Sequence, residues 1–202
     1  MTRGRIIVVS APSGSGKGTV IGKLLSLYPG ISPSISYTSR PPRQGEHEGV
    51  HYYFVSKDHF IDMINSGKFV EWDLYQGDYY GTSKAKIIDL LDSGKDIILD
   101  ITIKGAHAIR GQFPQATLVF LFPPSFIELE NRLRKRGTED DDKIEGRLTE
   151  ARREIMSSDS FDYYIINKNL EEAAKQLYTI LSAEKCRVRK DEFDTIINSI
   201  LN

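Results

Sequence analysis

The chain has 202 residues, 40% hydrophobic and 27% charged, so it can bury one sizeable core, and roughly 150 residues per domain makes one domain with insertions the default. Its net charge of −1 provides no broad basic field, which disfavours nucleic-acid binding through an electrostatic footprint. The single cysteine, Cys186, cannot form an intramolecular disulfide, and the N-terminal apolar run at 6–9 is too short for a signal or membrane segment, so we expect a cytoplasmic protein without nucleic-acid or membrane partners.

A β-branched run near the N-terminus breaks into a loop of small residues and restarts as a helical segment near Lys17, which should stop near residues 28–30. Gly14 and Gly16 let successive backbone N–H groups point at anionic oxygens, and the helix adds its positive dipole end. Lys17 supplies a mobile cation for the β- and γ-phosphates. The order of strand, loop, lysine and helix predicts a phosphate-binding loop rather than an ordinary Gly/Ser-rich connection. The predicted ATP-binding residues here are Ala11, Pro12, Ser13, Gly14, Ser15, Gly16, Lys17, Gly18 and Thr19.

The strict phosphate-loop pattern G-x-x-x-x-G-K-[ST] is missed at two positions. Ala11 stands at the first glycine, which is a mild departure, and Gly18 stands where Ser or Thr would bind Mg²⁺. The ending Gly-Lys-Gly-Thr resembles that of adenylate kinases, nucleoside monophosphate kinases whose metal is held largely by the nucleotide phosphates and water. In that comparison Thr19 would contact the α-phosphate.

Residues 33–82 read as a separate, tyrosine-rich unit. A turn is expected at 41–46, and a short amphipathic helix is expected over 58–64. The strand-like segments are residues 34–40, 52–55, 68–73 and 79–82. The pattern predicts a small mixed α/β insertion.

An alternation of helices and apolar strands then returns, which implies a parallel sheet covered on both faces. Ser125 is a good N-cap for a helix that Gly137 should close. The expected strands are residues 97–101, 117–122 and 163–167. The expected helices are residues 87–91, 126–136, a charged segment that contains 147–154, and a segment from about 170 through the C-terminus.

Six motifs, in one order along nearly the whole chain, resemble guanylate kinase. They are S-x-T-x-R-x-P-R-x-G-E at 36–46, G-V-H-Y-Y-F-V at 49–55, F-V-E-W at 69–72, Y-Y-G-T at 79–82, R-L-R-K-R-G-T at 132–138 and I-I-N at 165–167. Each motif is weak alone, and their shared order is specific. The resemblance implies an ATP:GMP phosphotransferase that makes GDP and ADP in purine nucleotide metabolism, accepts dGMP as well, and uses Mg²⁺ with ATP.

The same resemblance implies a division of the single domain 1–202. Its fold would be a P-loop α/β core with a parallel sheet and helices on both faces, carrying a small mixed α/β GMP-binding insertion and a helical lid. The core would be residues 1–33, 92–127 and 158–202, the insertion 34–91 and the lid 128–157.

Arg40 and Arg43 lie three apart in the predicted turn, where guanidinium groups can present forked donors to the acceptor phosphate. By themselves they are more readily read as solvated loop arginines. Tyr52 and Tyr80, whose hydroxyls the family aims at the same phosphate, favour the phosphate clamp.

Glu71 is the residue we expect to read the base. Guanine offers adjacent N1–H and N2–H₂ donors to one ionised carboxylate, whereas adenine would leave that carboxylate unpaired. Without the resemblance, Glu71 would be an ordinary alternating strand position. By family position, Ser36 and Thr82 would add hydroxyl contacts, chiefly to O6, and Thr102 would meet the amino edge.

The resemblance makes residues 128–157 a lid that closes over ATP. Arg136 and Arg147 would neutralise the transferring phosphoryl group, with Arg132 assisting. The alternative is that Arg132 and Arg136, four apart, form a solvated helix face with Glu128.

Two further residues complete the predicted site. Asp100, at the end of an interior strand, should hold Mg²⁺ through water, and Asn167 should meet adenine. The family pattern D-x-D-x-Q-G reads here Asp100-Ile101-Thr102-Ile103-Lys104-Gly105, so one carboxylate is missing and lysine replaces glutamine. These departures affect the base contacts and not the reaction class.

Two rival readings remain open from the sequence. A related small-molecule kinase such as ribose bisphosphate phosphokinase would share the phosphate loop but lack the nucleotide-reading insertion. A guanylate-kinase-like scaffold module would bind phosphorylated peptides without catalysis, against which the lysine and lid arginines argue. The sequence is compatible with either a monomer or a homo-oligomer.

Overall fold

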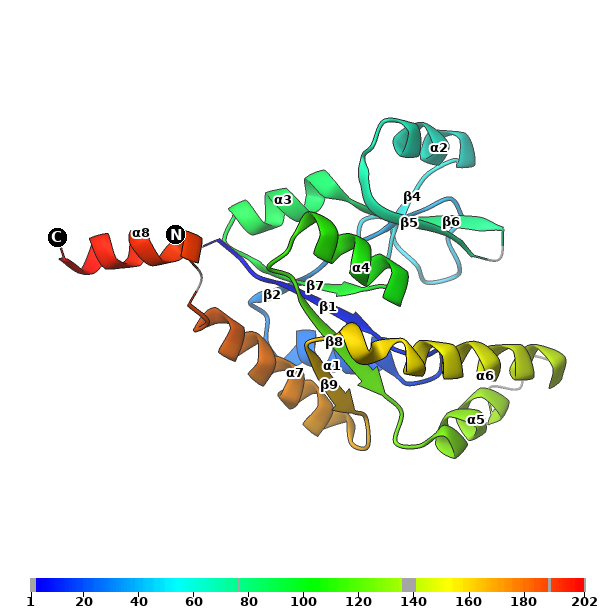
Figure 1. The fold of residues 1–202 in the computed structure, drawn as a ribbon. Coiled ribbons are helices and arrows are strands. Elements are labelled where there is room, and N and C mark those ends of the chain that lie inside the picture. Colours follow the sequence, from blue (N-terminus) through cyan, green and yellow to red (C-terminus); the bar gives the residue numbers. More distant parts are fainter. Residues whose placement is uncertain (1–2, 76, 136–140, 189, 202) are drawn as a thin grey trace.

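The computed structural model describes residues 3–75, 77–135, 141–188 and 190–201. A parallel sheet of five strands forms its centre, in the order β2-β7-β1-β8-β9 (Figure 1). The strands are β1 (Ile6–Ser10), β2 (Ile31–Pro33), β7 (Asp96–Asp100), β8 (Thr117–Phe122) and β9 (Tyr163–Ile166). All five residues of β1 are buried, as expected for an interior strand of a parallel sheet.

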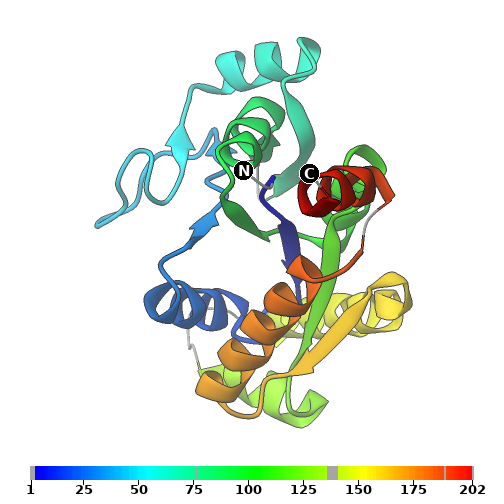
Figure 2. The same cartoon turned by 90° about the vertical axis from the view of Figure 1, so that its left-hand side faces the viewer.

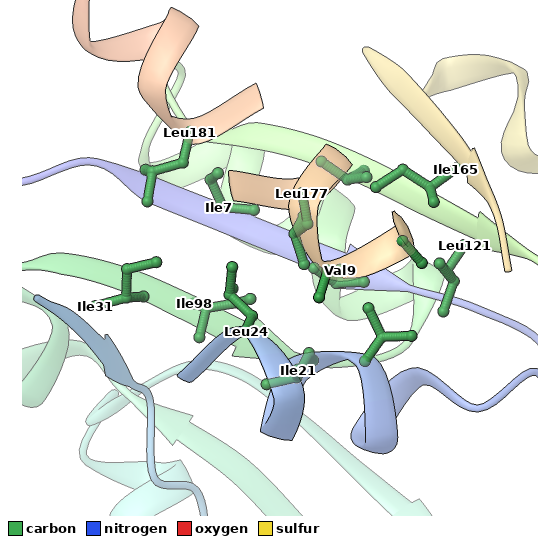
Figure 3. Packing of buried hydrophobic residues seen from close by; sticks show 14 residues of the cluster. Ile7, Val9, Ile21, Leu24, Ile31, Ile98, Leu121, Ile165, Leu177 and Leu181 are labelled. Carbon is green, nitrogen blue, oxygen red and sulfur yellow. The ribbon is translucent and has the colours of Figure 1, made fainter. Parts of the chain in front are cut away.

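Helices cover both faces of this sheet. Successive residues of a strand point to opposite faces, and in β1 Ile7 and Val9 belong to one core cluster while Ile6 and Val8 belong to another. The first cluster packs under α1 (Lys17–Leu27) and α7 (Leu170–Lys185), whose side chains gather with those of β1 in Figure 3. The second packs under α3 (Lys84–Asp92) and α4 (Ile103–Gln112). The predicted P-loop α/β core, a parallel sheet with helices on both faces, is confirmed.

A second, smaller sheet forms in the middle of the chain, in the order β4-β3-β6-β5. Its strands are β3 (Tyr37–Thr38), β4 (Tyr53–Phe54), β5 (Phe69–Tyr75) and β6 (Asp78–Ser83). The pair β3–β4 is parallel and the other two pairs are antiparallel. Helix α2 (Lys57–Asn65) packs on the sheet through Phe60 and Met63, which contact Phe69. This is the mixed α/β insertion that the sequence predicts.

Helices α5 (Phe126–Lys135) and α6 (Asp141–Met156) form a separate pair with an apolar contact of their own, through Leu129, Leu133, Ile144 and Leu148. A short 3₁₀ turn, Ser158–Ser160, leads from them to β9. In Figures 1 and 2 the insertion lies above β1 and this helix pair lies below it. The last helix, α8 (Lys190–Leu201), extends beyond α7 and away from the sheet (Figure 1). No described helix is long and apolar enough to cross a membrane.

The structure differs from the expected elements in four places. Strand β2 and helix α4 were not predicted. The expected strand at 34–40 is reduced to Tyr37–Thr38, and the prolines at 41 and 42, which cannot donate to a ladder, prevent its extension beyond residue 40. The expected long C-terminal helix is interrupted after Lys185.

Candidate active site

The loop between β1 and α1 has the backbone that the glycine spacing predicts. Gly14 and Gly16 have φ angles of 92° and 87°, which side chains of L-residues rarely adopt. A Cβ on Gly16 would lie 2.8 Å from the Asn167 Nδ2 atom, so this glycine is also required sterically. Helix α1 then begins at Lys17, and its N-terminus faces the loop as an anion site requires.

The Lys17 ammonium is held beside this loop. Its Nζ atom lies 2.7 Å from Asp100 Oδ1 and donates to the Ile101 carbonyl at 2.9 Å. Asp100 is the last residue of β7, opposite Val9 of β1. The parallel pairing of two interior strands therefore brings together a lysine and a carboxylate that are 83 positions apart.

Asp100 also faces Gly18, the second residue of α1. A Cβ on Gly18 would lie 3.9 Å from Asp100 Oδ2, so a serine or threonine there would point toward this carboxylate. Among the described residues, no group of three or more histidine, cysteine, aspartate or glutamate side chains could hold a metal ion. A metal at this position would have the Asp100 carboxylate beside it.

A second polar cluster lies in the insertion. Arg40 Nη2 pairs with Glu46 Oε1 at 2.9 Å, and Arg40 Nε donates to the Tyr80 hydroxyl at 3.3 Å. The backbone N–H of Arg43 donates to Glu46 Oε2 at 2.7 Å, and the Tyr52 ring lies 5.6 Å from Arg40 Cζ. The structure thus brings together the four residues predicted to clamp the acceptor phosphate.

Glu46 orients this cluster, although it is not among the site residues that the sequence predicts. Its bond to Arg40, followed by that to the Arg43 backbone, lowers the pKa of Glu46 to about 2, and the same contact raises the pKa of Arg40 above its usual value. Glu46 lies within the first family motif, and its spacing of three residues after Arg43 was the available signal. The pair keeps one guanidinium ionised and fixed before any substrate binds.

The predicted base-reading residues also converge. The Thr82 hydroxyl donates to Glu71 Oε1 in a short hydrogen bond, and Ser36 Oγ lies 3.5 Å from Thr82 Oγ1. Burial raises the pKa of Glu71, although the Thr82 hydroxyl opposes this shift. A Cβ on Gly105 would lie 3.1 Å from Glu71 Oε2, so the glycine at the start of α4 lets this carboxylate pack against the helix.

Thr102 has a structural contact that the sequence reading did not foresee. It is the N-cap of α4, and its hydroxyl oxygen accepts from the backbone N–H of Gly105 at 3.2 Å. This is the usual contact of a threonine at a helix start. The hydroxyl still lines the cleft, but one of its lone pairs is already used.

One cleft of about 830 Å³ joins the phosphate loop, the Arg40 cluster and the Glu71 pocket. Its walls also include two acidic residues that the sequence reading missed, Asp73 from β5 and Glu154 from α6. Burial, followed by the nearby charge of Glu150, raises the pKa of Glu154, while Lys17 opposes the shift. Neither residue lies in one of the family motifs, so only the fold could reveal them.

The predicted lid residues have different positions. Arg147 of α6 donates to the Ser13 hydroxyl of the phosphate loop. Arg132 Nε pairs with Glu128 at 2.9 Å on α5, as the helix-face alternative predicts, and Arg132 also lines a hollow of about 420 Å³ beside Gly14 and Thr19. Arg136 lies outside the described residues.

Asn167 is buried against the phosphate loop. Its Nδ2 atom donates to the Ser15 carbonyl at 2.8 Å, and its backbone N–H donates to Phe122 at 2.9 Å. It lines the same hollow as Arg132. Its contact with adenine stays a prediction, and its contact with the loop backbone is a second role that the sequence did not suggest.

Comparisons with known proteins agree with this geometry. The guanylate kinase family model matches residues 3–184. The guanylate kinase of Synechococcus sp. (strain JA-3-3Ab) is 44% identical over 180 residues, which cover 89% of this chain and 83% of the relative. The guanylate kinase of Carboxydothermus hydrogenoformans (strain ATCC BAA-161 / DSM 6008 / Z-2901) is 42% identical over 197 residues, which cover 98% of this chain and 97% of the relative.

A solved structure gives the same result for the fold. The crystal structure of guanylate kinase from Anaplasma phagocytophilum matches with a TM-score of 0.76 and 32% sequence identity, over 93% of this chain and 89% of that chain. The family match therefore extends across the sheet, the insertion and the helix pair that together line the cleft. The chain belongs to the guanylate kinase family.

Proposed function

We propose that this chain is an ATP:GMP phosphotransferase, which transfers the γ-phosphoryl group of ATP to GMP or dGMP and releases ADP and GDP or dGDP. Family membership supports the reaction. The observation that carries the assignment is the single cleft in which a phosphate loop with its lysine faces a carboxylate and an arginine cluster. Since ATP and GMP are cytoplasmic metabolites, we propose that the enzyme acts there.

GMP would bind in the insertion. Glu71 accepts from N1–H and N2–H₂ of guanine, and Ser36 and Thr82 contact O6, Thr82 once its hydroxyl proton turns from Glu71 to the base. Sites that select by buried hydrogen bonds can reject the wrong analogue by roughly 10⁴-fold or more. Partial burial of Glu71 supports this role because a carboxylate that is largely removed from water and left unpaired by adenine is destabilised.

The phosphate of GMP would bind at the other end of the insertion. Arg40 and Arg43 supply guanidinium donors, and the hydroxyls of Tyr52 and Tyr80 complete the set. The Glu46 contacts support this role because they hold Arg40 in place in advance, so less conformational entropy is lost when the phosphate binds.

Phosphoryl transfer needs positioning and charge neutralisation more than acid–base chemistry, because the attacking phosphate oxygen is already anionic. Lys17 and the loop N–H groups hold the ATP phosphates, and Arg147 neutralises the transferring group with Arg132 and Arg136. The contact of Arg147 with Ser13 supports this role because it brings α6 to the phosphate loop. Asn167 would contact adenine from the hollow beside the loop.

Mg²⁺ would accompany ATP. The residues present fit such an ion, since Asp100 is 47% exposed and faces Gly18, where no side chain competes for the space. Asp100 would hold the ion through water, with the nucleotide phosphates as the direct ligands. Bound there, Mg²⁺ neutralises charge on the phosphates.

We further propose that residues 34–91 act as the GMP-binding insertion and 128–157 as the lid on a core of 1–33, 92–127 and 158–202. Both appended units contribute to the cleft wall, so their approach toward the core would exclude water from the reacting phosphates. The insertion argues against a ribose bisphosphate phosphokinase. The pairing of Lys17 with Asp100 at the phosphate loop argues against a scaffold module without catalysis.

The experiment is direct identification of the product. Purified protein is incubated with ATP, Mg²⁺ and GMP, and the nucleotides are separated by ion-exchange chromatography. We expect GDP and ADP in equal amounts, and neither with Lys17→Ala. Release of ADP without GDP, or GDP formation that persists in Lys17→Ala, would contradict the proposal.

A further inference from the structure

Asp73 is an acidic residue of the cleft to which the proposed function assigns no role. It lies on β5, two residues after Glu71, so both side chains point to the same face of the insertion sheet while Trp72 points to the other. Both carboxylates line the cleft. The two carboxylates also interact electrostatically. Burial is the main reason that the pKa of Glu71 is raised, and the negative charge of Asp73 raises it further.

The strand register places Asp73 between the two ends of the proposed acceptor site. Glu71 pairs with Thr82 across the sheet, and Asp73 pairs with Tyr80. Glu71 and Thr82 are the proposed base readers, and the Tyr80 hydroxyl belongs to the phosphate cluster through Arg40. Same-face positions on a strand are roughly 6.5–7 Å apart, which is the scale of one nucleotide sugar. The group that joins base to phosphate in GMP is the ribose.

The carboxylate of Asp73 is held by contacts that use only one of its oxygens. Oδ1 accepts from the Leu74 backbone N–H at 3.0 Å and lies 3.4 Å from Lys104 Nζ. The described part of the chain offers no hydrogen bond to Oδ2. An ionised carboxylate is an acceptor only, so Oδ2 requires a donor from a ligand or from water.

The ion pair between Asp73 and Lys104 adds little to the stability of the fold. Their side chains are 44% and 75% exposed, and ion pairs at such exposure contribute little to stability. Lys104 stands where the family pattern has glutamine, two residues after the position where it has the second carboxylate. The chain therefore carries a set of charges at this wall of the cleft that differs from the family pattern, and Asp73 lines the cleft itself.

We propose that Asp73 is a specificity-determining residue that reads the ribose of the acceptor nucleotide, its Oδ2 atom accepting a hydrogen bond from the 2′-hydroxyl. Lys104 is a positioning residue that fixes Oδ1. In the nucleotide, the 2′-carbon is bonded to the carbon that carries the base. On β5, Asp73 is the next residue after Glu71 on the same face of the strand, so its position relative to Glu71 matches that of the 2′-hydroxyl relative to the base. Acidic side chains bind ribose hydroxyls in the same way in dinucleotide-binding folds. This inference rests on the proposed function, which makes GMP the acceptor.

The expected size of the effect follows from a charge-assisted hydrogen bond. Its loss corresponds to roughly a tenfold or greater change in affinity. The wild-type enzyme should therefore have a KM for dGMP about tenfold above its KM for GMP, with similar kcat, because the contact is the same in the ground and transition states. GMP and dGMP carry the same phosphate, so the ratio of their KM values cancels any general effect of charge near the phosphate.

The experiment is steady-state kinetics of Asp73→Asn with GMP, dGMP and IMP as acceptors, and calorimetry of the same nucleotides. We expect KM for GMP to rise about tenfold while KM for dGMP changes less than twofold, so that the two substrates become equivalent. Lys104→Gln should raise KM for GMP by a smaller factor and leave dGMP unchanged. Asp62→Asn, an exposed aspartate on α2, is the matched control and should change neither. Thermal melting of each variant checks that it folds, and Asp73→Ser is the second variant at the same position.

The outcomes separate the inference from the proposed function. If wild-type protein forms no GDP from GMP, the proposed function is wrong. If GDP forms but Asp73→Asn changes KM for GMP and dGMP by the same factor, the ribose assignment is overturned and the function stands. If the effect of Asp73→Asn is lost with IMP but kept with dGMP, Asp73 contacts the 2-amino group of guanine, and the ribose assignment is again overturned.

Discussion

The substitution Glu71→Gln removes the charge from the proposed base reader with almost no change in volume. The carboxylate can accept both N1–H and N2–H of guanine, whereas the glutamine amide has one acceptor oxygen and turns an NH₂ donor toward the other N–H. At least one hydrogen bond to a charged group is lost, which costs about 1.5–3 kcal/mol. At about 1.4 kcal/mol per factor of ten, KM for GMP should rise roughly 10- to 150-fold.

The turnover number should change little, because this contact is the same before and during phosphoryl transfer. The assay is coupled ADP release over a range of GMP concentrations, with Glu172→Gln on the exposed start of α7 as a control of the same chemistry. Melting temperatures should not fall, since the variant removes a partly buried charge whose hydrogen bond within the described part of the chain comes from Thr82. A KM for GMP within twofold of wild type would refute the base-reading role of Glu71.

Protonation of Glu71 should also make KM for GMP depend on pH. Burial raises the pKa of Glu71, so its protonated form appears at a higher pH than for an ordinary glutamate. A protonated carboxyl group accepts less well, and KM for GMP should therefore rise as the pH falls through that raised pKa. The rise should be absent in Glu71→Gln, and an identical pH profile in both proteins would show that another group titrates.

Three more predictions concern other parts of the molecule. Lys17→Ala should reduce phosphoryl transfer by on the order of 10³-fold or more while calorimetry shows unchanged GMP binding; loss of both in a folded variant would contradict separate donor and acceptor sites. Small-angle scattering should give a smaller radius of gyration with an ATP analogue plus GMP than with either alone, and equal profiles would contradict closure. Glu184 is buried, but its bonds from Arg187 and Tyr163 outweigh that burial and lower its pKa. Its contribution to stability is present above about pH 4.3 and is lost as pH falls through the lowered pKa. Glu184→Gln should lower the melting temperature at pH 7 by about 2–4 °C, the effect of roughly 1 kcal/mol in a chain of this size, and should flatten the acid dependence; an unchanged acid limb would contradict this.

Features that depend on residues close to one another in the sequence could be predicted from it. The phosphate loop was recognised because strand, glycines, lysine and helix follow one another directly, and the structure has α1 beginning at Lys17 as expected. The strand at 117–122 has the predicted bounds for the same reason, since a continuous apolar run ends at prolines.

Two elements were missed because their local signal is weak. The buried face of α4 consists of Gly105, Ala106 and Ile109, so its helical stripe contains little large apolar surface. Strand β2 has only three residues, 31–33, and exists because it pairs with β7. In both cases tertiary packing forms an element that propensity alone does not predict.

Contacts between distant residues account for most of what the sequence could not provide at the site. Asn167 and Ser15 are 152 positions apart, so no spacing rule could show that this amide supports the phosphate loop. Asp73 could be placed in the cleft only once the register of β5 against β6 was known. The family motifs identified residues that share a site, and the fold added the residues that hold them in position.

The most direct test of this account is the ratio of kcat/KM for GMP to that for AMP, measured for the wild-type protein and for Glu71→Gln under identical conditions. The account predicts a wild-type ratio on the order of 10⁴ or more that collapses in the variant, mainly through loss of activity with GMP. A wild-type ratio near one, or a large ratio that Glu71→Gln leaves unchanged, would contradict the claim that the Glu71 carboxylate selects guanine in this cleft.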